Sequence, residues 1–184
     1  KIMTGNITHC PICGFNKFKQ YSRNGDRDID FFQCERCGEF EVTWELLQGF
    51  TDLKRQIGEI GYILSGLARE LFETGGKRAL FTTKNIEENL KHYFVPDVNR
   101  IEEKIQKLLQ RLREKTEYFG QEIELRDIET VVPLAYAKNS AELIALFTLM
   151  TEKKLARIGV TKNGETRTVE ISLSADGWNI TNSL

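Results

Sequence analysis

Two pairs of cysteines near the N-terminus constrain what this chain can fold into more than any other feature of its sequence. Cys10 and Cys13 form one pair, Cys34 and Cys37 form the other, and twenty residues separate the pairs. A glycine follows each pair, and glycine can adopt the positive φ of a tight turn that aims two thiolates at one point. Because zinc takes four such ligands in a tetrahedron, the spacing predicts a zinc ion on Cys10, Cys13, Cys34 and Cys37.

The predicted zinc ion is structural. Four thiolates complete its coordination shell and leave no open position for a reacting group, which argues against metal catalysis. Iron, which four thiolates also bind, is the alternative ion. A unit of about forty residues rarely folds without a metal or a disulfide, so the ion would supply part of the folding free energy. Two close cysteine pairs in a reducing cytosol favour metal binding over disulfides.

Composition and charge narrow the class of protein. The chain has 184 residues, of which 40% are hydrophobic and 29% charged, as in an ordinary globular protein. Its apolar runs are shorter than a membrane span, and its first residues lack the apolar core of a secretory signal, so we expect a cytoplasmic protein without a membrane partner. The net charge of −1 gives no broad basic surface for nucleic acid, but it allows a local patch. We expect a small unit over 1–50 and a larger one over 51–184.

Hydrophobic periodicity and turn signals predict the secondary structure. We expect helices over 52–73, 84–93, 97–115 and 139–154, strands over 80–82, 122–125 and 130–136, and hairpins that turn at Asn24-Gly25 and Asn163-Gly164. A two-residue turn at Asn163-Gly164 pairs Ile158 with Val169 and places apolar side chains on one face of the hairpin. The charged side of the 97–115 helix is mixed in sign and is expected to face solvent.

Two local signals refine these helices. Asn139 and Glu142 stand at the spacing of a capping box, so they predict the start of the helix that ends at Lys153-Lys154. Gly61, Ser65 and Ala68 form a strip of small residues along the 52–73 helix. Because an interior glycine costs a helix about 1 kcal/mol relative to alanine, this strip predicts the close approach of another helix.

The N-terminal segment resembles the zinc-ribbon family. The matching residues are Cys10-Pro11-Ile12-Cys13-Gly14 and Cys34-Glu35-Arg36-Cys37-Gly38, and the resemblance covers about the first forty positions. Ribbons of this kind occur in nucleic-acid enzymes, transcription proteins and bacterial defence proteins. The resemblance therefore implies a metal but does not identify a partner.

The C-terminal segment over 139–178 resembles the end of a winged helix-turn-helix domain of the MarR or PadR type. A helix ends at the charged stretch that begins Lys153-Lys154, a two-stranded wing follows, and Leu173-Ser174-Ala175-Asp176-Gly177-Trp178 closes the wing. The chain departs from that pattern before residue 139, where a long helix and a predicted strand pair replace compact helices. If the resemblance extends to DNA binding, the candidate contacts are Lys138, Asn139, Ser140, Lys162, Asn163 and Arg167.

The sequence thus predicts an α+β protein, with a four-cysteine zinc ribbon followed by a mainly helical winged-helix-like domain that ends in a β-hairpin. We expect a regulatory recognition module that binds double-stranded DNA, as the N-terminal part of a larger bacterial regulatory or defence protein. Ala145 and Thr148 on the exposed side of the last long helix offer little to base edges, which favours the alternative. In that alternative the chain is a protein-interaction, oligomerisation or sensor module that controls an effector domain without touching DNA. No catalytic motif is present, so we expect neither an enzyme nor a small-molecule substrate.

Overall fold

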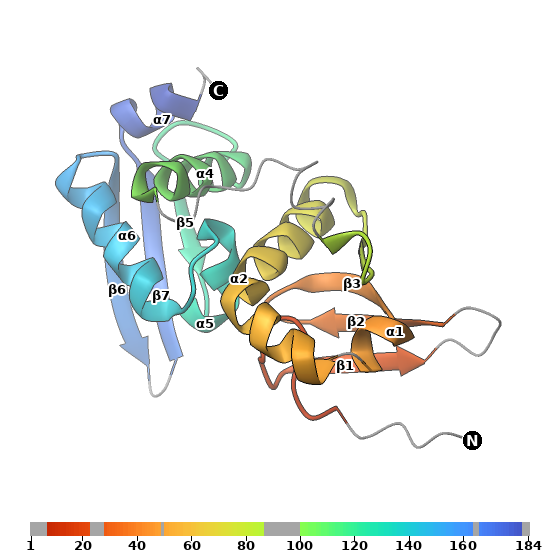
Figure 1. The fold of residues 1–184 in the computed structure, drawn as a ribbon. Helices are drawn as coiled ribbons and strands as arrows, with labels where there is room; N and C mark the ends of the chain where they lie inside the picture. The colour runs from red at the N-terminus through yellow and green to blue at the C-terminus, as the bar shows by residue number, and fades with distance from the viewer. Residues whose placement is uncertain (1–6, 23–27, 49, 87–99, 164–165, 182–184) are drawn as a thin grey trace. The chain divides into compact units, whose positions relative to one another are not determined.

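The computed structural model describes residues 7–22, 28–48, 50–86, 100–163 and 166–181, and these form a mixed α and β fold (Figure 1). The chain divides into two units, Lys1–Val95 and Pro96–Leu184. The expected α+β class is therefore confirmed, but the division falls after residue 95 and not near residue 50. The expected turn at Asn24-Gly25, most of the expected helix over 84–93 and Gly164 lie outside the described residues.

The first unit is a four-stranded sheet with a long helix. Its elements are β1 (Phe18–Ser22), β2 (Ile29–Cys34), β3 (Gly38–Thr43), α1 (Trp44–Gln48), α2 (Phe50–Gly75) and β4 (Ala79–Phe81). The strands lie in the order β1-β2-β3-β4, with the first three antiparallel and β4 parallel to β3. Phe32 and Phe40 are cross-strand partners with ring centroids 5.4 Å apart, and Phe81 of β4 meets Phe40 at 6.1 Å. These buried rings form the core of the sheet.

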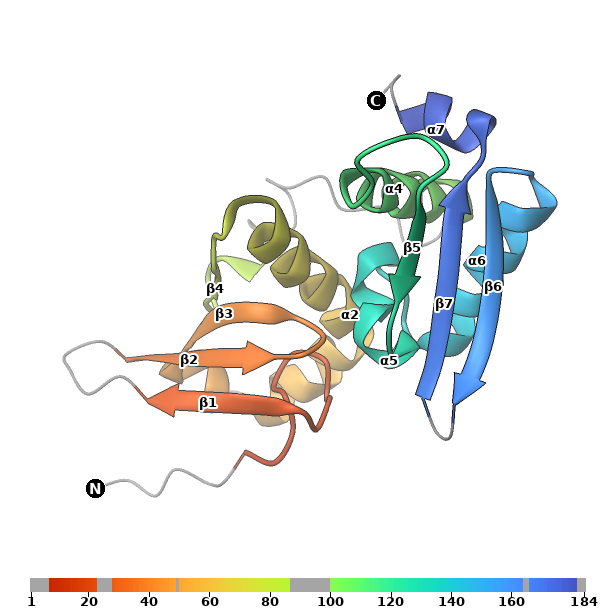
Figure 2. The ribbon, with the colours of Figure 1, turned by 180° about the vertical axis from the view of Figure 1, so that it is seen from behind.

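Helix α2 packs on this sheet, as the view from behind makes clear (Figure 2). Leu64, Leu67 and Ala68, from the apolar stripe that predicted the helix, are buried. Phe72 lies so close to Gly38 that a Cβ at position 38 would stand 2.6 Å from its ring. Residues 60–81 therefore belong to the same folded unit as the cysteines, because α2 and β4 both pack on β3.

The second unit is a three-stranded sheet with helices on one face. Its elements are α4 (Ile101–Glu114), β5 (Glu122–Leu125), α5 (Ile128–Val131), the 3₁₀ helix η1 (Val132–Ala135), α6 (Ser140–Glu152), β6 (Ala156–Asn163), β7 (Thr166–Leu173) and α7 (Ala175–Thr181). The strands are antiparallel in the order β5-β7-β6. Helices α4, α5 and α6 cover one face of this sheet, and the core lies between them and the strands (Figure 1, Figure 2).

The strand expected over 130–136 is wrong, because this segment forms the end of α5 and the whole of η1. The Asp127 side chain accepts a hydrogen bond from the Glu129 backbone N–H and so starts α5. Every residue from Val131 to Ala137 is buried. A continuous apolar run does not distinguish a buried strand from short buried helices, but Pro133 disfavours a strand inside a sheet.

The terminal hairpin has a different register from the one expected. Ile158 pairs with Ile171 and Asn163 pairs with Thr166, so the two connecting residues are 164 and 165. The expected partner of Ile158 was Val169, two positions away. Because side chains alternate with a period of two, this difference leaves the same residues on the core face, where Val169 and Ile171 are fully buried.

Helix α7 closes the hairpin through Ser174 and Gly177. The Ser174 backbone N–H donates to the Leu155 carbonyl at 3.0 Å, and the Ser174 hydroxyl accepts from the Gly177 N–H at 3.2 Å. Gly177 packs against the same carbonyl so closely that a Cβ at this position would overlap the Leu155 oxygen. The Leu-Ser-x-x-Gly segment therefore joins α7 to the start of β6.

The charged side of α4 does not face solvent throughout, contrary to the sequence expectation. Lys104, Lys107 and Arg111 are 1%, 4% and 3% exposed, beside the expected apolar stripe that includes Leu108. The Lys104 ammonium lies 2.5 Å from Glu142 of α6. One side of α4 therefore packs through long cationic side chains, which bury their methylene stems.

Candidate metal centre

Two turns of the first unit present the four cysteines. Cys10 and Cys13 stand in the turn before β1, where the Gly14 N–H donates to the Cys10 carbonyl at 2.9 Å. Cys34 ends β2 and Cys37 immediately precedes β3. Gly14 and the glycine after Cys37 have φ values of 70° and 75°, as the sequence predicted for residues that close such turns.

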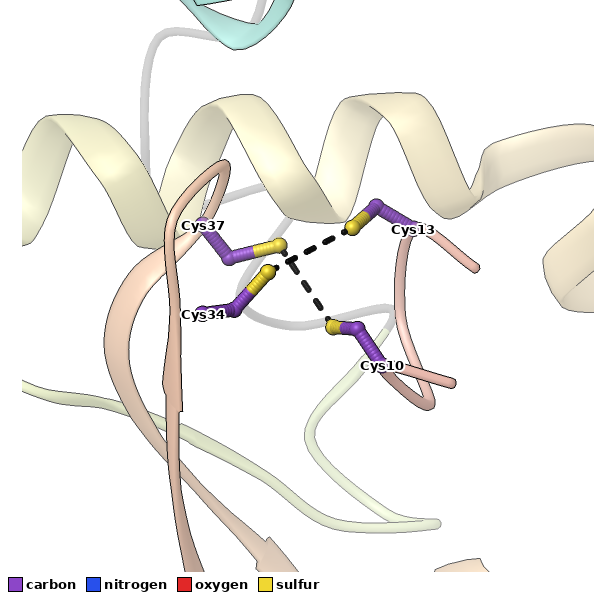
Figure 3. Close-up of side chains that lie close together, drawn as sticks. All are labelled: Cys10, Cys13, Cys34 and Cys37. Atoms are coloured by element: carbon purple, nitrogen blue, oxygen red, sulfur yellow. Dashed lines mark hydrogen bonds between the residues drawn. The ribbon is translucent and has the colours of Figure 1, made fainter. Parts of the chain in front are cut away.

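The four sulfur atoms converge on one point (Figure 3). Cys10 Sγ and Cys37 Sγ are 3.8 Å apart, Cys13 Sγ and Cys34 Sγ are 3.7 Å apart, and all four lie within 4.8 Å of one another. These separations are far longer than a disulfide bond, and all four cysteines are free. A tetrahedral ion with metal–sulfur bonds of about 2.3 Å places its sulfurs about 3.8 Å apart, so the cluster has the size that such an ion needs.

The surroundings of the sulfurs oppose a cluster of four charges without a cation. Burial raises the pKa of the Cys10 and Cys37 thiols well above their ordinary value. Hydrogen bonds from the neighbouring thiols, that of Cys10 first, lower the pKa of Cys34 below its ordinary value. A metal cation at the centre would allow all four to ionise, because it replaces mutual repulsion with attraction.

Helix α2 also reaches this cluster, which the sequence did not indicate. Ser65 Oγ lies 3.2 Å from Cys37 Sγ. The strip of small residues on α2 was expected to admit a second helix, but at Ser65 the neighbour is Cys37 of the second cysteine turn. The only sequence signal that singled out Ser65 was its position in that strip of small residues.

The candidate nucleic-acid residues all belong to the second unit and fall into two groups. Lys138, Asn139 and Ser140 stand at the start of α6, where the Asn139 side chain caps the helix by accepting the Glu142 N–H at 2.9 Å. Lys162 and Arg167 are cross-strand partners near the end of the hairpin, and both are exposed. Asn163 is the last residue of β6.

The two groups lie toward the same end of the second unit. In both views α6 begins at the end of the unit where β6 finishes (Figure 1, Figure 2). Within the first group, Lys138 and Asn139 are exposed and Ser140 is half-buried. The capping hydrogen bond occupies the Asn139 oxygen, so this side chain has a structural role already.

Comparison with models of known protein families, with curated proteins and with solved structures found no match for the chain. None of the described helices combines the length and the apolar character needed to cross a bilayer. The functional conclusions therefore depend on the cysteine cluster and on the end of the second unit where α6 begins.

Proposed function

We propose that the chain is a zinc-stabilised recognition module whose second unit is a winged helix that binds double-stranded DNA. The metal part of the proposal is supported by the convergence of the four sulfur atoms. Cys10, Cys13, Cys34 and Cys37 would hold the ion, and four soft thiolates in a tetrahedral arrangement favour zinc, with iron as the alternative. The ion would cross-link two turns and would leave no coordination position for a substrate.

The order of elements in the second unit supports the winged-helix part. Helix α4, strand β5, the α5–η1 segment and α6 precede the β6–β7 hairpin, and the sheet order is β5-β7-β6. The short helices α5 and η1 stand where a strand was expected, so that α5, η1 and α6 are consecutive helices, and this supports the comparison with the family pattern. In this proposal α6 is the recognition helix and the β6–β7 hairpin is the wing.

One observation carries the DNA proposal. The exposed cations Lys162 and Arg167 of the hairpin lie toward the end of the unit where α6 begins, and the exposed Lys138 stands there too. Cations at two neighbouring elements can neutralise phosphates on both sides of a groove, and the positive end of the α6 dipole adds to this field. A local patch of this kind is compatible with a net charge of −1.

The exposed face of α6 favours a second candidate function, protein interaction. Ala141, Ala145 and Thr148 are exposed on this helix. The two alanines have no hydrogen-bonding group with which to read base edges, which weakens the case for α6 as a recognition helix and leaves this face open to a protein partner. In this candidate, α6 would bind a protein partner or a second copy of the chain.

A duplex-binding titration separates the two functions. We expect the double variant Lys162→Glu/Arg167→Glu to bind a fluorescent duplex at least tenfold more weakly than wild type. The slope of log affinity against log salt should fall by about 2, because each of the two cations would neutralise one phosphate. Fluorescence anisotropy at several salt concentrations measures both quantities.

The matched control is Lys153→Glu/Lys154→Glu, which makes the same charge change at the other end of α6, where both lysines are exposed. This control should bind duplex within about twofold of wild type, because those lysines lie outside the proposed surface. Wild-type protein that binds no duplex, or wing variants that bind as wild type does, would exclude the DNA proposal. Light scattering on the same samples would then detect self-association, as the second candidate predicts.

A further inference from the structure

Ser65 brings helix α2 into contact with the cysteine cluster. Its Oγ lies 3.2 Å from Cys37 Sγ, which is hydrogen-bond distance for sulfur. Ser65 is 2% exposed and Cys37 is 0% exposed, so water does not compete for this contact. The contact exists because α2 packs on the β1–β3 sheet and places its buried face toward the second cysteine turn (Figure 3).

The chemistry of a metal ligand fixes the direction of this hydrogen bond. A cysteine that binds a metal is a thiolate and has no proton to give, so its sulfur only accepts. The Ser65 hydroxyl therefore donates to Cys37 Sγ whenever Cys37 is a ligand. Four thiolates on a divalent ion leave a net negative charge, which such donors stabilise.

The serine is an unfavourable choice for the helix alone. Alanine is a better helix former than serine, and it would bury no polar group at this position. A buried hydroxyl is tolerated when it has a hydrogen-bond partner, and a serine inside a helix commonly finds one in the carbonyl of the preceding turn. At position 65 the hydroxyl instead lies at hydrogen-bond distance from a cysteine sulfur.

We propose that Ser65 is a positioning residue of the metal centre, which donates a hydrogen bond to Cys37 and couples the docking of α2 to the bound ion. The inference rests on the proposed metal centre. It extends that centre beyond the two cysteine turns to α2, a helix that begins thirteen positions after Cys37. The hydrogen bond raises metal affinity because it stabilises the thiolate form of Cys37.

The test compares wild type with Ser65→Ala in the full chain. Competition with a chromophoric chelator should give an apparent zinc affinity at least tenfold lower in Ser65→Ala, the usual size of an effect on a residue that supports a ligand. In the cobalt(II) form, the thiolate-to-cobalt charge-transfer band should move to lower energy, because sulfur loses a hydrogen bond. Thr74→Ala on the same helix is the control, since the Thr74 hydroxyl donates to the Glu70 carbonyl and leaves sulfur untouched.

A second pair of variants removes side-chain volume from the comparison. Ser65→Thr and Ser65→Val have the same shape, and they differ in the hydroxyl alone. If packing tolerates them equally, the threonine variant should bind zinc at least tenfold more tightly than the valine variant and should keep the wild-type cobalt spectrum. Any difference in zinc affinity between these two variants reports the hydroxyl, because their side chains have nearly the same volume.

The outcomes distinguish this inference from the proposed centre. Weaker zinc binding in Ser65→Ala together with the shifted cobalt band supports it. Equal affinity and an unchanged cobalt spectrum in both comparisons overturn the role of Ser65 and leave the cysteine centre standing. A wild-type chain that takes up neither zinc nor cobalt overturns the centre itself and the inference with it.

Discussion

The Glu142 carboxylate holds the start of α6 through both of its oxygens. Its Oε1 lies 2.5 Å from Lys104 Nζ, and its Oε2 accepts the Lys138 backbone N–H at 2.6 Å. Lys104 is buried, so Glu142→Gln leaves its ammonium without this carboxylate in a low-dielectric environment. Because Glu142 is partly exposed, we expect the variant to lower the free energy of unfolding by about 1–3 kcal/mol, less than the loss of a fully buried pair. Urea unfolding followed by far-UV circular dichroism measures it.

Glu152→Gln is the control for that variant, because Glu152 is an exposed glutamate of the same helix. Its unfolding free energy should stay within about 0.5 kcal/mol of wild type. Equal free energies of unfolding for Glu142→Gln and Glu152→Gln would show that the Lys104–Glu142 pair does not stabilise the fold.

The same pair predicts a pH dependence. Burial raises the pKa of Glu142. Hydrogen bonds from Lys104 and from the Lys138 N–H, together with the charges of both lysines, lower it by a larger amount, so the pKa lies below its ordinary value. A lowered folded pKa means that the carboxylate stabilises the fold above the unfolded value of about 4.3, and that this is lost as pH falls through the folded pKa. The stability difference between wild type and Glu142→Gln should therefore be full at about pH 6 and shrink toward about pH 3. A difference that stays constant with pH would contradict this assignment.

At the level of single residues, the sequence predicts metal ligands better than it predicts the side chains that support them. The cysteines could be recognised because two ligands in one turn have a fixed spacing, whatever the rest of the chain does. The role of Ser65 depends on how α2 docks on β3, which no local pattern encodes. The burial of Lys104 likewise depends on α6, since its partner Glu142 is thirty-eight positions away.

At the level of elements, Gly177 offers the sharpest test of how the hairpin is closed. We expect Gly177→Ala to lower the free energy of unfolding by about 1–3 kcal/mol, because the added Cβ would overlap the Leu155 carbonyl, which a rigid backbone cannot move aside cheaply. Gly159→Ala on β6 is the control, since its Cβ would meet Glu170 side-chain atoms no closer than 3.7 Å. Thermal unfolding gives the melting temperature of each variant. A melting temperature of Gly177→Ala that is no lower than that of Gly159→Ala would contradict this account.

The elements that the sequence predicted correctly are those with a clear period or a clear cap. Helix α2 has a strong apolar stripe, and Asn139 caps α6 as expected. The run from Val131 to Ala137 is buried throughout, so its hydrophobic periodicity could not distinguish a strand from short helices. The hairpin kept its expected faces because alternation fixes which side chains are buried, whereas the register depends on which two residues form the connection.

At the level of the whole molecule, the extent of the first unit could not be predicted from the sequence. A zinc ribbon alone would end near residue 50, but three residues of β4 pair with β3 and return the chain to the first sheet. Parallel pairing joins segments that are far apart in sequence, and so short a strand has little pattern of its own. The cysteine cluster therefore belongs to a larger folded unit whose core includes α2, and the packing of α2 on β3 helps to hold the two cysteine turns.

The central claim is that one metal ion bridges the two cysteine turns. X-ray absorption spectroscopy of the purified protein tests it most directly, because the edge identifies the element and the fine structure gives its ligands. The account predicts zinc with four sulfur neighbours at about 2.3 Å. A chain with no bound metal, or a metal whose neighbours are nitrogen or oxygen, would contradict it.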